Sequence, residues 1–100
     1  MRGYEGYEQL ARLHVYDKCV SIDITWSEVE AMLDGGEVIE AHVFDDLMVK
    51  EIRLLLDWDV PLHVVYVVHH DRRLIVFRTI YLPTLNEWQP GFREGRKRHG

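Results

Sequence analysis

The stretch Pro61 to Leu82 constrains the fold more than any other part of this chain. It holds two runs rich in Val, Ile, Tyr and Phe, and the polar segment 69–73 separates them. Such residues favour strands, so two runs around a short polar segment predict a β-hairpin. Each run is too short to cross a membrane, which takes about 20 apolar residues. Both faces of this strand pair are largely apolar, so we expect the hairpin in the middle of a sheet that is covered on at least one side.

A hairpin turn centred on Asp71-Arg72 fixes which side chains share a face. The predicted cross-strand pairs are Tyr66–Phe77, Val68–Ile75 and Leu62–Tyr81. Because side chains alternate along a strand, the opposite face holds His63, Val65, Val67, His69, Leu74, Val76, Arg78 and Ile80. We expect the helices on the Tyr66/Phe77 face and the working surface on the His63/Arg78 face. A slip of one residue would invert every one of these assignments.

The segment before the hairpin predicts two helices. Apolar residues at helical spacing indicate a first helix over 4–20, with His14 on or beside its buried stripe. A second helix runs from Thr25 to about Leu33, because Thr25-Trp26-Ser27-Glu28 is a capping box. We expect one glycine of Gly35-Gly36 in the left-handed conformation at its end.

Two further strands are expected at 37–44 and 47–56, and Pro83 ends the sheet after the hairpin. The order α-α-β-β-β-β predicts an α+β fold, in which two N-terminal helices pack on one face of a four-stranded antiparallel sheet. Residues 1–90 form one domain and residues 91–100 form a basic C-terminal tail.

The cysteine content and the first residues of the chain indicate the cellular compartment in which we expect the protein. Cys19 is the only cysteine, so no intramolecular disulfide forms, and we expect a small buried side chain there. The start of the chain has no apolar secretory segment. We therefore expect a cytoplasmic protein that does not enter a membrane.

Charge is distributed unevenly along the chain. Residues 1–90 carry eight basic and sixteen acidic groups, whereas residues 91–100 carry four basic groups and one acidic group. An acidic body with a basic tail favours contact with an anion, or with another protein, through the C-terminus. The alternative is a solvated, frayed tail.

Several motifs follow one another in a characteristic order. They are His14, the capped helix Thr25 to Leu33, residues 36–40, residues 61–65, residues 79–83 and Trp88. Their order resembles a family of small prokaryotic proteins known mainly as a domain of unknown function, whose genes are often found beside zinc-finger antitoxins. That family is similar in size and layout to RelE-like and BrnT-like toxins, which cleave RNA.

The resemblance implies RNA cleavage without a metal or other cofactor. Such chemistry needs proton transfer to and from the RNA oxygens and a cation for the phosphate. We assign proton transfer to His63 and His14, the phosphate to Arg78, and name Tyr81 as a further candidate. The alternative for His63 is a sheet histidine under a helix, hydrogen-bonded to a backbone carbonyl. The alternative for Arg78 is a salt bridge to Glu28 or Glu30.

Basic and aromatic residues outside the hairpin strands form the expected RNA-binding rim. They are Arg72, Arg73, Trp88, Arg93, Arg96, Lys97 and Arg98. The alternative for Trp88 is that it pins the tail to the core. His69-His70-Asp71 has metal-ligand residue types, but adjacent strand residues point to opposite faces, so we expect no metal site.

The sequence therefore predicts a toxin-like, metal-independent endoribonuclease whose partners are an RNA substrate and a protein antitoxin. The alternative is a non-catalytic interaction module that forms a homodimer or a complex subunit. The acidic body favours this alternative, because most RNA-binding domains are basic.

Overall fold

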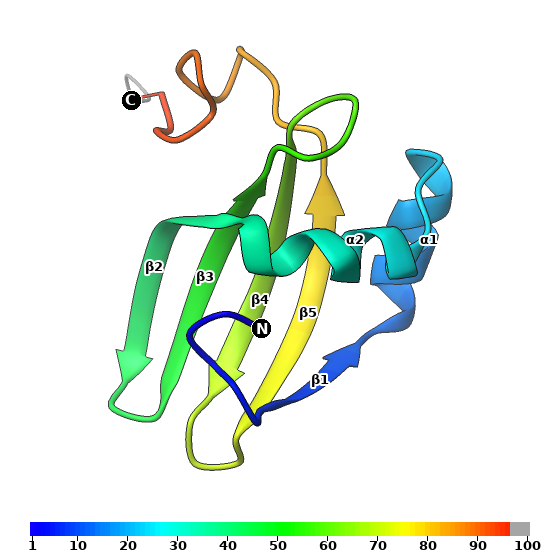
Figure 1. Cartoon of the computed structure of the whole chain (residues 1–100). Helices are drawn as coiled ribbons and strands as arrows, with labels where there is room; N and C mark the ends of the chain where they lie inside the picture. Colours follow the sequence, from blue (N-terminus) through cyan, green and yellow to red (C-terminus); the bar gives the residue numbers. More distant parts are fainter. Residues whose placement is uncertain (97–100) are drawn as a thin grey trace.

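The structure, a computed structural model, describes residues 1–96 and has an α+β fold (Figure 1). Its elements are β1 (Glu8–Ala11), α1 (Leu13–Ser21), α2 (Trp26–Met32), the 3₁₀ turn η1 (Leu33–Gly35), β2 (Glu37–Asp45), β3 (Met48–Leu55), β4 (Leu62–His69) and β5 (Leu74–Tyr81). Within residues 1–96, no helix is long and apolar enough to cross a membrane.

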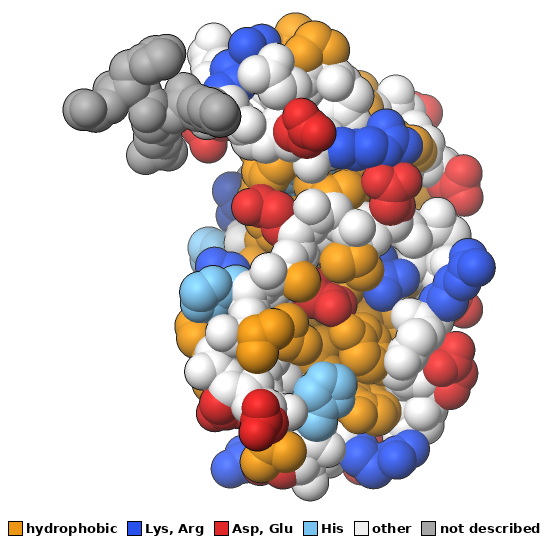
Figure 2. Space-filling view, turned by 90° about the vertical axis from the view of Figure 1, so that its left-hand side faces the viewer, with side chains coloured by type: hydrophobic (Ala, Val, Ile, Leu, Met, Phe, Trp, Pro, Cys, Tyr) orange, Lys and Arg blue, Asp and Glu red, His pale blue; other side chains and the backbone are white. Residues whose placement is uncertain are grey.

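The sheet has five strands in the order β1-β5-β4-β3-β2. Strands β2 to β5 are antiparallel neighbours, whereas β1 runs parallel to β5. The predicted α+β fold with two helices is confirmed, but the purely antiparallel four-stranded sheet is wrong in detail. Strand β2 forms one outer edge, and Figure 2, which views the molecule from this side, shows hydrophobic side chains exposed along it.

The extra strand comes from the first half of the predicted helix 4–20. Residues 8–11 pair with residues 74–77 of β5, and the Glu8 N–H donates to the Arg73 carbonyl at 2.9 Å. Helix α1 begins only after Arg12, whose backbone is extended. The free edge of β5 offers hydrogen bonds that an isolated helical turn lacks, so pairing overrides the helical spacing of the apolar residues.

The helices cover the Tyr66/Phe77 face, as predicted. Helix α2 crosses in front of β4 and β5 (Figure 1), and Trp26 packs edge-on against Phe77 with ring centroids 4.8 Å apart. Tyr66 and Phe77 are fully buried. The buried side chains of α1 and α2 on this side are Val15, Cys19, Val29 and Met32, so the prediction for Cys19 is confirmed.

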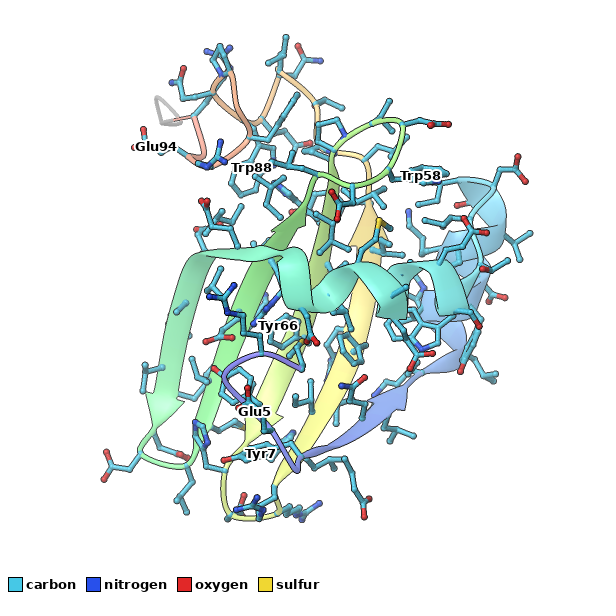
Figure 3. All side chains as sticks on the ribbon, in the orientation of Figure 1. Glu5, Tyr7, Trp58, Tyr66, Trp88 and Glu94 are labelled. Atoms are coloured by element: carbon cyan, nitrogen blue, oxygen red, sulfur yellow. The ribbon has the colours of Figure 1, made fainter. Side chains whose placement is uncertain are left out.

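A buried polar network surrounds Tyr66 on the helix-covered side of the sheet. Tyr66 is labelled in Figure 3. The Tyr66 hydroxyl accepts a hydrogen bond from Arg53 Nε at 3.0 Å and donates to Glu51 Oε1 at 2.8 Å. Tyr4 donates to the other oxygen of Glu51 at 2.6 Å, and Arg53 donates to the Arg2 carbonyl at 3.2 Å. The network therefore ties the N-terminal segment to β3.

The ends of α2 confirm one prediction and correct another. Thr25 Oγ1 accepts from the Glu28 N–H at 3.2 Å, so the predicted cap is present. Neither Gly35 nor Gly36 adopts the left-handed conformation, so that prediction is wrong. Gly36 instead lies so close to β3 that a Cβ atom would approach Leu55 Cδ2 to 2.6 Å. Its hydrogen side chain is needed for close approach rather than for a special φ angle.

The β4–β5 hairpin contains a β-bulge that the sequence pattern does not indicate. The predicted pairs Tyr66–Phe77 and Val68–Ile75 are present, but Val65 pairs with Thr79, which leaves Arg78 as an extra residue. Beyond the bulge, Tyr81 pairs with His63, so the predicted Leu62–Tyr81 pair is wrong. The bulge also turns Ile80 into the helix-covered core, away from the face expected for it.

Candidate functional site

The sheet face opposite the helices holds an open hollow of about 470 Å³. Its floor is apolar, and its lining comes from strands β2 to β5. The lining residues are Phe44, Met48, Lys50, Val65, Val67, His69, Arg78 and Thr79. We call this surface the cationic hollow.

The cationic hollow gathers positive side chains on a chain whose formal net charge is −5. Lys50 on β3 and Arg78 on β5 lie on either side of Val65 and Val67 of β4. Two strand spacings separate their backbones by about 10 Å, a gap that two long side chains span together. Among the described residues that line the cationic hollow, none is acidic. The arrangement suits one phosphate group held between Lys50 and Arg78.

His14 lies beside this surface. It is exposed at the start of α1 and precedes the buried Val15, so it lies beside the buried stripe rather than on it. Its Nε2 atom is 3.3 Å from Thr79 Oγ1, and Thr79 lines the cationic hollow next to Arg78. Imidazole is a side chain that can both accept and donate a proton. The structure thus brings two of the predicted catalytic residues, His14 and Arg78, to neighbouring positions.

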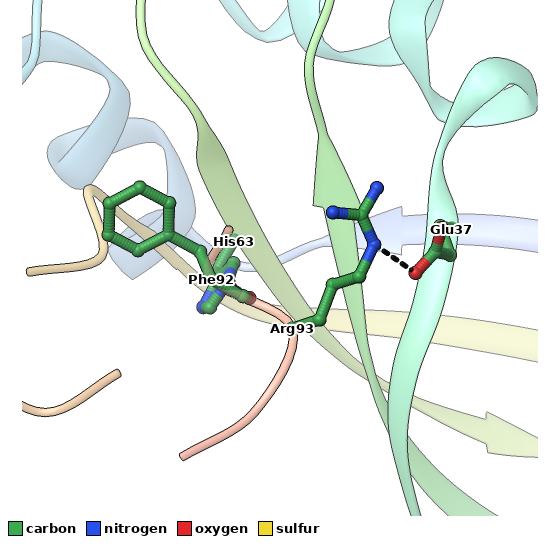
Figure 4. Close-up of polar contacts among 4 residues, drawn as sticks. All are labelled: Glu37, His63, Phe92 and Arg93. Carbon is green, nitrogen blue, oxygen red and sulfur yellow. Dashed lines mark hydrogen bonds and ion pairs between the residues drawn. The ribbon is translucent and has the colours of Figure 1, made fainter. Parts of the chain in front are cut away.

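His63 and Tyr81 form a separate, buried pair. His63 is fully buried, and its Nδ1 atom lies 3.1 Å from the Tyr81 hydroxyl. Its Nε2 atom lies 2.8 Å from the Phe92 carbonyl oxygen (Figure 4). Burial lowers the pKa of His63, while the Phe92 carbonyl and Glu40 oppose this effect. Burial and the nearby carboxylates Glu40 and Glu87 raise the pKa of Tyr81 to about 12.

The segment after β5 covers this pair. Trp88 is buried, and its ring lies edge-on to His63 with centroids 4.4 Å apart. Trp88 also forms a β-bridge with Gly95, and the guanidinium of Arg96 donates to the Leu85 carbonyl. Arg93 Nε forms a 2.8 Å ion pair with Glu37 of β2 (Figure 4). Trp88 therefore attaches the C-terminal segment to the core. His63 is bonded to a backbone carbonyl, as the alternative expected, but the C-terminal segment covers it instead of a helix.

The hairpin tip carries the remaining predicted rim residues that the structure describes. Arg72 is exposed, and the Arg73 guanidinium lies over the Tyr7 ring, 5.2 Å from its centroid. Lys97 and Arg98 lie outside the described residues. His69 lines the cationic hollow, whereas His70 Nδ1 lies 2.8 Å from the Tyr7 hydroxyl on the other side of the sheet. The expected divergence of these adjacent histidines is confirmed.

A second hollow of about 500 Å³ adjoins the cationic hollow at the β2 edge. The two share Phe44 and Lys50. The second hollow is lined by Glu40, Ala41, His42, Phe44, Lys50 and Ile52, and the rings of His42 and Phe44 pack edge-on with centroids 4.7 Å apart.

Sequence reasoning did not single out Lys50, Thr79 or Phe44. Lys50 lies in the segment 47–56, whose charged residues fit a helix as well as a strand. Pairing with β4 settles the register of this segment and turns Lys50 toward the open face. Thr79 reaches the same face through the Arg78 bulge, which no periodicity predicts.

Comparison of the chain with protein-family models, with curated proteins and with solved structures finds no match in any of the three.

Proposed function

We propose that this chain is a toxin-like, metal-independent endoribonuclease that acts from the cationic hollow and is held in check by a protein antitoxin. One observation carries the proposal. On an acidic chain, Lys50, His69 and Arg78 gather around an open apolar floor that has no acidic residue among its described lining. An RNA strand brings phosphates for the cations and bases for the apolar surface.

The proposed roles go to residues that line the cationic hollow or lie beside it. Arg78 and Lys50 hold the scissile phosphate and stabilise the charge that develops on its oxygens. His14 takes the proton of the 2′-hydroxyl, and Thr79 orients its imidazole through the 3.3 Å contact. The 2′-oxygen then bonds to phosphorus while the bond to the 5′-oxygen breaks. The departing 5′-oxygen takes up a proton from solvent water, and the products carry a 2′,3′-cyclic phosphate and a 5′-hydroxyl.

His63 and Tyr81 take a different role in this proposal. Both nitrogens of His63 are engaged, and its side chain is fully buried. It therefore positions the C-terminal segment and does not contact RNA. Arg72 at the hairpin tip remains available to bind the RNA backbone.

The test is cleavage of single-stranded RNA by the purified chain in the presence of a metal chelator. Arg78→Ala should lower the rate by about 10²–10³, as expected for loss of a group that stabilises the transition state. His14→Ala should lower it by about 10²–10⁴. Arg2→Ala, which removes an exposed arginine of the N-terminal segment, is the matched control and should cleave like the wild type.

Growth on expression without a partner gives a second readout. The wild type should arrest growth, and Arg78→Ala should relieve the arrest. Cleavage that requires a divalent metal, or equal cleavage by wild type, Arg78→Ala and His14→Ala, would refute the assignment.

A non-catalytic interaction module is the second candidate, and the exposed apolar side chains of β2 favour it. Val43 is 67% exposed and Phe44 is 52% exposed. Normal growth and high yield of the lone wild-type chain in a bacterial host would favour this module over a potent toxin.

A further inference from the structure

We propose that β2 is the interface of a two-fold symmetric homodimer, in which the β2 strands of two copies pair antiparallel about Ala41. The interface would join two five-stranded sheets into one continuous sheet. The proposal concerns assembly, so it holds whether or not the chain cleaves RNA.

Strand β2 is a long, open edge of the sheet. It spans nine residues, lies at the end of the strand order and contains neither Lys nor Pro, two residues that commonly protect an edge. Between Glu37 and Asp45, β2 pairs with β3 on one side, and no backbone hydrogen bond from any other described segment reaches it. Unpaired N–H and C=O groups along such an edge are a template for another strand. The edge-on view in Figure 2 shows apolar side chains among charged and histidine side chains there.

The sequence of β2 is complementary to itself in an antiparallel pairing. A two-fold axis through Ala41 pairs each residue with the one equally distant on the other side, as an isologous interface requires. The resulting pairs are Glu40–His42, Ile39–Val43, Val38–Phe44 and Glu37–Asp45. The pair next to the axis joins an acid to a histidine, and the following pair, Ile39–Val43, joins two apolar residues. Because of the symmetry, each of these favourable pairs occurs twice.

The small side chain of Ala41 suits the axis, where it lies directly opposite the same side chain of the other copy. Glu40 and His42 both line the second hollow, so they share one face and meet directly across the interface. Strand β2 is irregular against β3 near Ile39 and Phe44, but residues 40–43 pair in regular register. The centre of the interface therefore lies on the regular part of the strand.

The outer pair Glu37–Asp45 joins two acids, and contacts within each copy offset this repulsion. Glu37 forms the ion pair with Arg93, and Asp45 Oδ1 accepts the Leu47 N–H at 2.7 Å. The second hollow lies at this edge. In the dimer it would extend into the matching hollow of the other copy.

A charge exchange tests the pairing. The wild type should sediment at twice the mass of the 11.9 kDa chain at high concentration. His42→Glu places Glu opposite Glu twice and should weaken dimerisation about tenfold. Combining His42→Glu with Glu40→His restores the opposed pair and should restore the wild-type dissociation constant. Glu30→Lys on the exposed face of α2 is the control and should have no effect.

Cysteine cross-linking tests the register. In a Cys19→Ala background, Ala41→Cys places two thiols across the axis, with Cα atoms about 4.5–5.5 Å apart, within disulfide range. Val38→Cys lies six residues from its symmetry mate, about 20 Å away, and should not cross-link. A chain that stays monomeric at all concentrations, a double exchange that fails to restore the dimer, or equal cross-linking at both positions would overturn the proposal.

Discussion

The imidazole Nε2 of His63 lies 2.8 Å from the carbonyl oxygen of Phe92, a residue 29 positions further along the chain. This contact joins the central hairpin to the C-terminal segment. The same imidazole contacts the Tyr81 hydroxyl through Nδ1. His63 thus links three parts of the chain from a fully buried position.

Replacing His63 with Phe should destabilise the protein by about 1–3 kcal/mol, because the change keeps an aromatic ring but leaves the Phe92 carbonyl and the Tyr81 hydroxyl unpaired. Urea denaturation measures the loss, and proteolysis should cut residues 84–96 faster. Leu85→Ala removes an exposed side chain of the same segment and should change stability by less than about 0.5 kcal/mol. Equal stability of His63→Phe and wild type would contradict this role.

Stability should fall as pH drops below about 6.5, the ordinary pKa of histidine. Burial lowers the pKa of His63 in the folded chain, so the unfolded chain takes up a proton at a higher pH. The free energy of unfolding therefore decreases from about 6.5 down to the folded pKa. Carboxylates add their own pH dependence, so the informative quantity is the difference between wild type and His63→Phe. That difference should shrink on acidification, and a constant difference would argue against the lowered pKa.

Gly36→Ala should cost about 1–3 kcal/mol, because the added methyl group overlaps Leu55 Cδ2 and Arg53 Cγ at 2.6 and 2.7 Å. Gly35→Ala is a matched control at the adjacent position. Its Cβ would meet only Asp57 Oδ2 at 3.6 Å, an ordinary contact. Thermal unfolding of the two variants should therefore separate them clearly, and equal melting temperatures would contradict the close approach of Gly36 to β3.

Tyr66→Phe should destabilise the fold by about 1–3 kcal/mol, because the lost hydroxyl bridges the buried side chains of Arg53 and Glu51. Tyr16→Phe removes the hydroxyl of a tyrosine that is 45% exposed and should have little effect. Chemical denaturation measures the free energy of unfolding of both variants. A Tyr66→Phe variant as stable as Tyr16→Phe would mean that Arg53 and Glu51 do not depend on this bridge.

The sequence alone determined the elements whose signals are local. The capping box fixed the start of α2 through the Thr25–Glu28 contact. Residue types and the short turn fixed the hairpin pairs Tyr66–Phe77 and Val68–Ile75. The apolar content of the Tyr66/Phe77 face determined which side the helices cover, because burial of that surface stabilises the fold.

Only the tertiary structure decided the features that depend on distant partners. Residues 8–11 became a strand because β5 had an unpaired edge. The Arg78 bulge placed Thr79 in the cationic hollow and Tyr81 beside His63. Burial of His63 required a C-terminal segment to fold back over the sheet. Periodicity reports the environment of neighbouring residues, whereas these contacts join segments far apart in the chain, so only the folded sheet decides them.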